Sequence, residues 1–190
     1  MTLQSHFVTD RARFGLSLDA LVDRIVAAAR GGVSVIQIRE RDLPDRDLAA
    51  LVRRVIAAVQ PAAARVVVND RADVAIAAGA AGVHLRADSL PGARVRAIAP
   101  PGFIIGRSVH DGGEVDAAVA ENAYDYLLFG TVFPSAGKPA GHRTAGVDGL
   151  RDACHRSTMP VIAIGGVDAT RLALIEASGA AGFAAVGMFM

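Results

Sequence analysis

The sequence alternates short apolar runs with longer segments of helical period, and this alternation repeats along the whole chain. The runs contain almost no in–out alternation of polar residues, which is typical of strands buried on both faces. Strands that alternate with helices predict a parallel sheet. The predicted strands are residues 6–9, 34–39, 65–69, 82–85, 103–108, 124–130, 160–166 and 182–187.

Seven segments between these runs have helical period, and the last run has no helix after it. Ser17 is the expected N-cap of the first helix. The predicted helices are residues 18–29, 45–60, 71–78, 91–99, 114–122, 148–155 and 169–177. Eight strands favour an α/β fold of the closed (β/α)8 TIM-barrel type over a doubly wound open sheet. We expect a compact single domain over residues 1–190 that lacks its final outer helix, with N-terminal residues or a partner subunit covering that side.

Composition limits the classes of protein to which the chain can belong. With 190 residues, 52% of them apolar, it can bury one full core. The net charge of +1 gives no sign of nucleic-acid or membrane binding. The lone Cys154 excludes an internal disulfide and suits a reducing compartment. No apolar run has the length of a membrane span, and the first residues do not resemble a signal peptide, so we expect a cytoplasmic protein.

In a barrel of this kind the site lies where strands end and the following loops begin. Polar residues and glycines gather at these positions in the sequence. They are Asp10, Arg39, Arg41, Asn69, Asp70, Arg86, Asp88, Ser108, His110, Lys138, Gly165, Gly166, Val186 and Gly187. We therefore predict one ligand site at this rim.

The glycines that follow the last two strands fit a phosphate site. Gly165, Gly166 and Gly187 would let backbone N–H groups approach the anion closely. The alternative is that these glycines only form tight turns with positive φ. Their presence on two neighbouring strands favours phosphate binding.

Gln37, Arg39 and Arg41 share one face of the second strand, because side chains alternate along a strand. An arginine directed into the barrel needs a carboxylate or an anion as its partner. Arg39 thus binds substrate, or it forms a structural ion pair with Asp70 or Glu40. Arg41 binds substrate or is simply solvated.

Two further residues have both a structural and a functional interpretation. Asp70 could bind a metal ion, but its position favours an N-cap of the following helix. His110 could carry a proton at neutral pH, and Asp111 is available to cap the helix that follows. His84 is expected to be a core histidine with satisfied hydrogen bonds, whereas His142 and His155 belong to a loop and the surface. No Cys/His spacing indicates zinc.

The chain resembles the thiamine phosphate synthase/TenI superfamily of (β/α)8 barrels over nearly its whole length. The resemblance rests on six segments in order: "VTDR" at 8–11, "IQIRER" at 36–41, "VVVNDRADVAIAAGAAGVHL" at 66–85, "IIGRSVH" at 104–110, "YDYLLFGTVFPS" at 124–135 and "PVIAIGG" at 160–166. It implies one of two activities in thiamine biosynthesis. A synthase joins a pyrimidine pyrophosphate to a thiazole phosphate with Mg²⁺, and a TenI-type tautomerase aromatises a carboxythiazole phosphate without a metal.

Several positions depart from the synthase pattern. Arg41 replaces a lysine, and Ser89 stands where the second Mg²⁺-binding aspartate is expected, with Asp88 one residue early. Lys138 matches, but Gly137 replaces a threonine that helps to hold pyrophosphate. One carboxylate in place of two should bind Mg²⁺–pyrophosphate poorly. The resemblance therefore favours the TenI branch.

As a tautomerase, the chain would use His110 as its acid/base and need no cofactor. Ser108 would orient the ligand or the imidazole, and Arg39 would face the substrate carboxylate. Gly165, Gly166 and Gly187 would hold the phosphate. The partner is then a small phosphorylated thiazole, and a homo-oligomer is compatible with this expectation.

Two alternatives stay open. The chain could be a thiamine phosphate synthase with an altered metal site, in which Asp70 binds Mg²⁺. It could instead be a non-catalytic regulator that binds a thiazole or thiamine phosphate on the same barrel.

Overall fold

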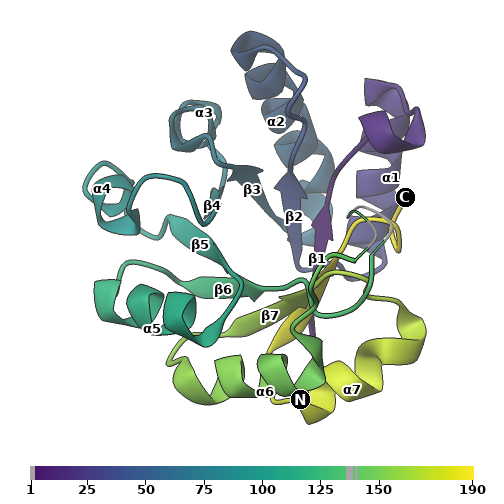
Figure 1. The fold of residues 1–190 in the computed structure, drawn as a ribbon. Coiled ribbons are helices and arrows are strands. Elements are labelled where there is room, and N and C mark those ends of the chain that lie inside the picture. The colour runs from purple at the N-terminus through teal and green to yellow at the C-terminus, as the bar shows by residue number, and fades with distance from the viewer. Residues whose placement is uncertain (1–2, 136–138, 140) are drawn as a thin grey trace.

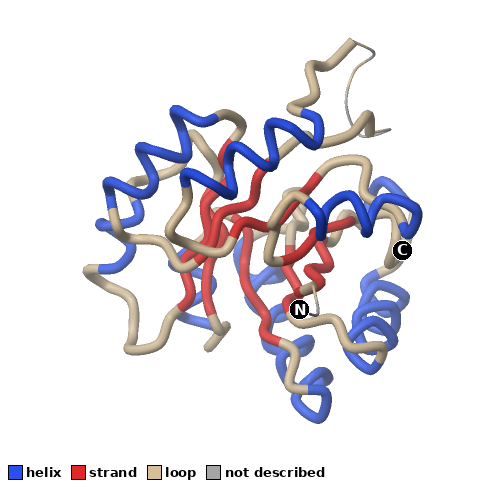
Figure 2. Tube along the Cα trace, turned by 90° about the horizontal axis from the view of Figure 1, so that it is seen from below, coloured by secondary structure: helices blue, strands red, loops and turns tan. Residues whose placement is uncertain are grey.

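Eight parallel strands form a closed barrel with the helices around it (Figure 1). This computed structural model describes residues 3–135, 139 and 141–190. Figure 2 shows the strands gathered in the middle of the molecule and the helices on the outside. Each strand pairs in parallel with its neighbours in sequence, and β1 pairs with β8 to close the sheet. The predicted (β/α)8 TIM-barrel fold is confirmed.

The elements follow the predicted order. The strands are β1 (Gln4–Val8), β2 (Val35–Ile38), β3 (Arg65–Asn69), β4 (Gly82–Leu85), β5 (Ile104–Val109), β6 (Tyr126–Phe129), β7 (Val161–Ile164) and β8 (Gly182–Ala185). The helices are α1 (Leu18–Arg30), α2 (Asp45–Val59), α3 (Ala72–Ala78), α4 (Gly92–Arg96), α5 (Gly112–Glu121), α6 (Gly146–Arg156) and α7 (Leu172–Ala177). Short 3-10 turns lie at Ala12–Phe14, Gln60–Ala62 and Ala169–Arg171.

Local capping explains where the helices begin. Ser17 caps α1 as predicted, because its side chain accepts a hydrogen bond from the Ala20 N–H at 3.1 Å. The predicted seventh helix is divided into a 3-10 turn and α7. Asp168 caps the 3-10 turn by accepting from the Thr170 N–H at 3.0 Å. The fourth helix ends earlier than expected, at Arg96, and beyond it both Ile98 and Ala99 donate to the carbonyl of Val95.

The seam between β1 and β8 is covered on its outer side by the residues that follow β8. No helix follows β8 among the described residues up to Met190. Instead the ring of Phe189 packs against Phe7 at 5.2 Å and against Phe183 at 6.4 Å between centroids. At the seam itself, a Cβ on Gly182 would lie 2.2 Å from the carbonyl oxygen of Gln4, so this pairing requires glycine.

The interior of the barrel contains a polar chain as well as apolar side chains. Val8, Tyr126, Leu128, Ile162 and Ala184 form an apolar cluster separate from the core under the helices. His84 lies beside it, with Nδ1 3.0 Å from the Tyr126 hydroxyl and Nε2 2.8 Å from Ser108 Oγ. His84 is thus the satisfied core histidine that the sequence predicts, although it also lines the cavity described below.

His6, unlike His84, is a buried histidine whose ring forms no hydrogen bond with the described part of the chain. It is 2% exposed, and neither ring nitrogen has a hydrogen-bond partner among the described residues. Its ring instead meets the ring of Tyr126 edge-on, 5.2 Å away. Burial is the main reason that the pKa of His6 falls to about 4 and that of His84 to about 3.

The helices of the described residues include none whose length and hydropathy would let it span a bilayer.

The buried histidines predict acid sensitivity. Above about pH 6.5 both imidazoles are neutral in the folded and the unfolded chain, so their burial causes no pH dependence. As the pH falls below that value the unfolded chain takes up protons first, and stability is lost until the folded pKa of His6, about 4, is reached. Each histidine then contributes a loss of about 1.4 kcal/mol per pH unit.

Replacement of His6 isolates the contribution of this residue to the loss of stability at acidic pH. We expect His6→Leu to be neutral or stabilising near pH 8, because it removes an unpaired buried polar group at similar volume. The advantage of the variant should grow by about 1.4 kcal/mol per pH unit between roughly pH 6 and pH 4.5. Urea unfolding across this range measures it, with the exposed His155→Gln as control. Parallel pH profiles for wild type and His6→Leu would contradict the assignment.

Candidate active site

A cavity of about 880 Å³ opens at the carboxyl ends of the strands. It is lined by residues that follow different strands of the barrel, which is where a site is expected in this fold. Of the predicted residues, the cavity brings together Arg39, Arg41, Asn69, Ser108, His110, Gly165, Gly166, Val186 and Gly187. Lys138 lies outside the described residues. The roles of all of these residues remain predictions.

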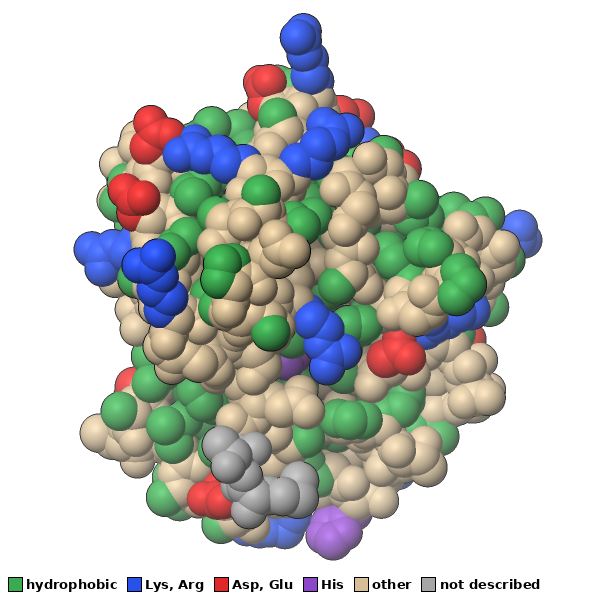
Figure 3. All heavy atoms as spheres, turned by 180° about the vertical axis from the view of Figure 1, so that it is seen from behind, with side chains coloured by type: hydrophobic (Ala, Val, Ile, Leu, Met, Phe, Trp, Pro, Cys, Tyr) green, Lys and Arg blue, Asp and Glu red, His purple; other side chains and the backbone are tan. Residues whose placement is uncertain are grey.

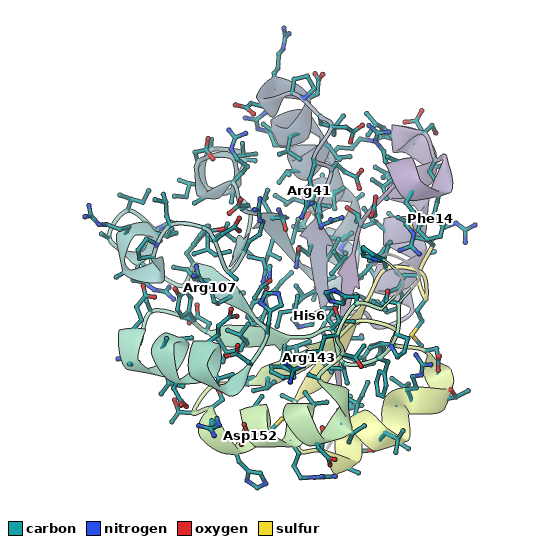
Figure 4. All side chains as sticks on the ribbon, viewed as in Figure 1. His6, Phe14, Arg41, Arg107, Arg143 and Asp152 are labelled. Atoms are coloured by element: carbon teal, nitrogen blue, oxygen red, sulfur yellow. The ribbon has the colours of Figure 1, made fainter. Side chains whose placement is uncertain are left out.

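Arginine side chains are frequent among the described residues that line the cavity. Figure 4 looks into this end of the barrel and shows Arg41 on the side of β2. The lining contains five arginines, Arg13, Arg39, Arg41, Arg86 and Arg171, against three aspartates, Asp10, Asp88 and Asp168. The excess of guanidinium groups favours anionic ligands. The opposite face of the molecule, in Figure 3, carries scattered acidic and basic side chains without such a gathering.

Arg39 forms its ion pair with Asp10, at 3.1 Å, and not with Asp70 or Glu40 as the sequence suggested. The reason is the pairing of β1 with β2, which places Asp10 next to Arg39. Thr9 Oγ1 accepts from the Arg39 N–H at 2.9 Å and fixes the two chain segments together. Glu40 is used elsewhere, since its carboxylate accepts from the Arg11 N–H at 3.2 Å.

Arg41 makes no ion pair with any of the described residues. It is exposed, in line with the interpretation that it is solvated, yet it also lines the cavity. Burial of part of the side chain, and the positive charges of Arg39 and Arg86, lower the pKa of Arg41. The carboxylates of Asp10 and Asp70 offset part of this effect and favour the charged form of Arg41.

Asp70 does not cap a helix, so the prediction of an N-cap is wrong. The N-cap residue of α3 is Arg71, and no side chain caps this helix end. Asp70 has a φ of 62°, a left-handed conformation that aspartate tolerates better than most residues. Its N–H bonds to the carbonyl of His84 at 2.8 Å, which ties Asp70 to β4. Its carboxylate consequently reaches the loop after β4, where it accepts a hydrogen bond from Ser89 Oγ.

The residues around Asp70 do not fit a divalent metal ion. Arg86 lies between the two nearby carboxylates, with Nη1 3.5 Å from Asp70 and Nη2 paired with Asp88. Mg²⁺ needs carboxylate oxygens that are open to it, and here the guanidinium of Arg86 contacts both carboxylates and places a positive charge between them. No cluster of three or more acidic, His or Cys side chains able to hold a metal occurs in the described part of the chain.

The loops that contain Gly165, Gly166 and Gly187 support both expected roles of these glycines, tight turns and phosphate binding. Gly165 and Gly166 have φ of 100° and 63°, and a Cβ on Gly166 would lie 2.3 Å from the carbonyl oxygen of Pro134. Glycine is thus required for the turn itself. Gly187 has neither a left-handed φ nor a close neighbour that excludes a side chain. The N–H groups of Gly166 and Gly187 find no acceptor among the described residues, which leaves them for an anion.

Two histidines border the cavity, in different environments. His84 is buried and holds Ser108 at the cavity floor. His110 lies at the rim with its side chain about half exposed (52%), and its Nδ1 is 2.9 Å from the Glu114 carboxylate. Asp111 caps α5 by accepting from the Glu114 N–H at 2.9 Å, so His110 is not needed as a cap.

Sequence reasoning missed the carboxylate of Glu114, which contacts His110 at this rim. Glu114 could have been found, because it stands four residues after His110, a spacing that brings side chains together at a helix start. Glu40, which the sequence suggested as a partner of Arg39, contacts Arg11 instead. It is 4% exposed and joins the ends of β1 and β2, and burial raises the pKa of its carboxyl group.

Comparisons with known proteins agree with this architecture. The sequence profile of the TMP-TENI family, described as thiamine monophosphate synthase, matches residues 5–189. A putative thiamine-phosphate synthase of Geobacter sulfurreducens is 39% identical over 95% of this chain and 84% of its own length. A thiamine-phosphate synthase of Methanoculleus marisnigri is 42% identical over 84% of this chain and 75% of its own length.

A solved structure with a related function in its name also resembles this chain closely. The thiamine phosphate pyrophosphorylase of Pyrococcus furiosus superposes with a TM-score of 0.85 and 32% identity, over 97% of this chain and 85% of that one. A 3-hexulose-6-phosphate synthase, at 16% identity and a TM-score of 0.70, shares the fold alone.

These relatives bear the synthase name, so the preference for the TenI branch finds no support in them. The superfamily itself, inferred from six sequence segments, is supported. The chain belongs to the thiamine monophosphate synthase family, TMP-TENI.

Proposed function

We propose that the chain is a thiamine phosphate synthase, the second of the activities expected from the sequence and the one that its relatives' names favour. In this reaction the thiazole nitrogen forms a bond to the methylene carbon of the pyrimidine substrate. The carbon–oxygen bond to pyrophosphate breaks, and pyrophosphate leaves with the bonding electrons. Both substrates carry phosphate groups.

The observation that carries the proposal is a single cavity with two separate anion-binding sides. Arg39, Arg41 and Arg86 lie at the ends of β2 and β4, and the N–H groups of Gly166 and Gly187 lie at the ends of β7 and β8. A pyrophosphate needs several cationic donors, and a monophosphate suits a glycine loop. The volume of about 880 Å³ is large for one small ligand, and it suits two substrates bound side by side.

In this arrangement the chain's own residues bind and position the substrates. The arginines would neutralise the pyrophosphate, which becomes a better leaving group when its charge is balanced. The glycine loops would hold the thiazole phosphate. Ser108, fixed by His84 at 2.8 Å, would present its hydroxyl to a ring at the cavity floor.

A tautomerase is the second candidate, because of one specific observation. Glu114 holds Nδ1 of His110, while Nε2 has no partner among the described residues. An imidazole oriented by a carboxylate in this way can act as a general acid or base. The two candidates therefore differ in whether the reaction depends on His110.

The proposed activity is tested directly with the purified protein. Incubation with hydroxymethylpyrimidine pyrophosphate and thiazole phosphate should release pyrophosphate and thiamine phosphate in equal amounts. Ser108→Ala should lower kcat/KM about tenfold, the effect of one lost hydrogen bond of about 1.4 kcal/mol. Ser5→Ala, at the other end of the barrel, is the matched control. A folded protein that releases no pyrophosphate would exclude the synthase.

His110→Ala separates the two candidates. The variant should fold, because Asp111 still caps α5. We expect it to retain synthase activity within a few fold, since no proton transfer at His110 is needed to form the new bond. If the chain is instead a tautomerase, aromatisation of the carboxythiazole phosphate should be measurable in the wild type. It should fall by about 10²–10⁴-fold in His110→Ala.

A further inference from the structure

The loop after β4 places a fixed cation where two carboxylates could have held a metal. Arg86 contacts Asp70 through Nη1 at 3.5 Å and Asp88 through Nη2. Its own N–H donates to Ser89 Oγ at 2.8 Å, and that hydroxyl donates in turn to Asp70. Loop and β3 end are thus joined by a closed set of contacts that holds the guanidinium in place.

This arrangement leaves Arg86 able to bind a ligand. Its side chain is 42% exposed and lines the cavity. A guanidinium has five N–H donors, and the two carboxylate contacts use only part of them. The remaining donors can reach an anion in the cavity, and the planar fork matches phosphate oxygens.

Arg41 supplies a second cation without a partner. It makes no ion pair with the described residues, and its charge lies near those of Arg39 and Arg86. Arg39 and Arg86 are each held by carboxylates, whereas no described carboxylate contacts Arg41 directly. An anion bound beside Arg41 and Arg86 would gain charge-assisted hydrogen bonds from donors that these carboxylates do not use.

We propose that Arg86 and Arg41 bind the pyrophosphate group directly, so that the cavity takes up pyrophosphate without a divalent cation. The identity of this anion as the leaving group rests on the proposed function. The binding itself does not depend on turnover. The Arg86 side chain would then neutralise part of the negative charge of the pyrophosphate, as a metal ion would by coordination. The carboxylates of Asp70 and Asp88 position Arg86.

Calorimetry on the full chain with inorganic pyrophosphate tests this proposal. In the presence of EDTA the wild type should bind pyrophosphate, and replacing EDTA with Mg²⁺ should change the affinity by less than about threefold. Arg86→Gln should weaken binding at least tenfold, roughly the effect of losing one hydrogen bond to a charged group. Arg94→Gln, an exposed arginine of α4 outside the cavity, should have no effect.

A second variant guards against misfolding of the first. Arg41→Gln removes a side chain that pairs with no described carboxylate, so it should not lower the thermal stability. It should still weaken pyrophosphate binding several fold. Arg86→Gln combined with Ser89→Asp should make binding dependent on Mg²⁺, because it removes the guanidinium and places a new carboxylate at position 89 beside those of Asp70 and Asp88.

The outcomes distinguish this proposal from the proposed function. Binding in EDTA that requires Arg86, without formation of thiamine phosphate, would support the anion site and exclude the synthase. Thiamine phosphate formation that requires Mg²⁺ and is unchanged in Arg86→Gln would support the synthase and overturn the anion site. Absence of any pyrophosphate binding in EDTA would also overturn it.

Discussion

Closure of the sheet between β1 and β8 is the constraint on which the site depends. Because every strand is parallel to the next, closure brings all eight carboxyl ends to one rim. Residues as distant in sequence as Arg39 and Gly187 then share one cavity. The seam tolerates no side chain at Gly182, and Phe189 covers its outer side against Phe7 and Phe183. The geometry of the rim is therefore set by contacts that lie outside the site.

The fold could be predicted from the sequence because its signals are local and repeated. Each apolar run bounded by turn residues gave a strand, and the side-chain caps Ser17 and Asp111 mark true helix starts. The early end of α4 and the 3-10 turn before α7 could not be predicted. Both depend on local hydrogen bonds, such as those from Ile98 and Ala99 to the Val95 carbonyl, which leave no periodic signal in the sequence.

The location of the site was also predictable, but the pairing of its charges was not. A strand end that carries polar residues indicates the rim, and this sufficed to place Arg39, Ser108 and His110 in one cavity. Which carboxylate meets which arginine depends on the register between strands. Arg39 pairs with Asp10 because β1 lies beside β2, and the left-handed backbone of Asp70 carries its carboxylate to Ser89 instead of to α3.

The interior of the barrel couples the core to the site through one chain of polar groups. Tyr126, His84 and Ser108 are joined by hydrogen bonds of 3.0 and 2.8 Å. A buried imidazole that is neutral at physiological pH can donate through one nitrogen and accept through the other, so it fixes the orientation of both hydroxyl groups. Ser108 is thereby held rigidly at the cavity floor, which is the kind of support that precise positioning requires.

The use of a guanidinium instead of a metal has a physical consequence for the site. A divalent cation arrives with its substrate or from solution, whereas Arg86 is part of the chain and is present before any substrate binds. Its position then has to be maintained without ligand, and Asp70, Ser89 and Asp88 do this. Ser89 and Arg86 both depart from the synthase pattern, and both contact Asp70. A carboxylate at position 89 would add a third negative charge to those of Asp70 and Asp88, which the single guanidinium of Arg86 could not balance, whereas the Ser89 hydroxyl adds none.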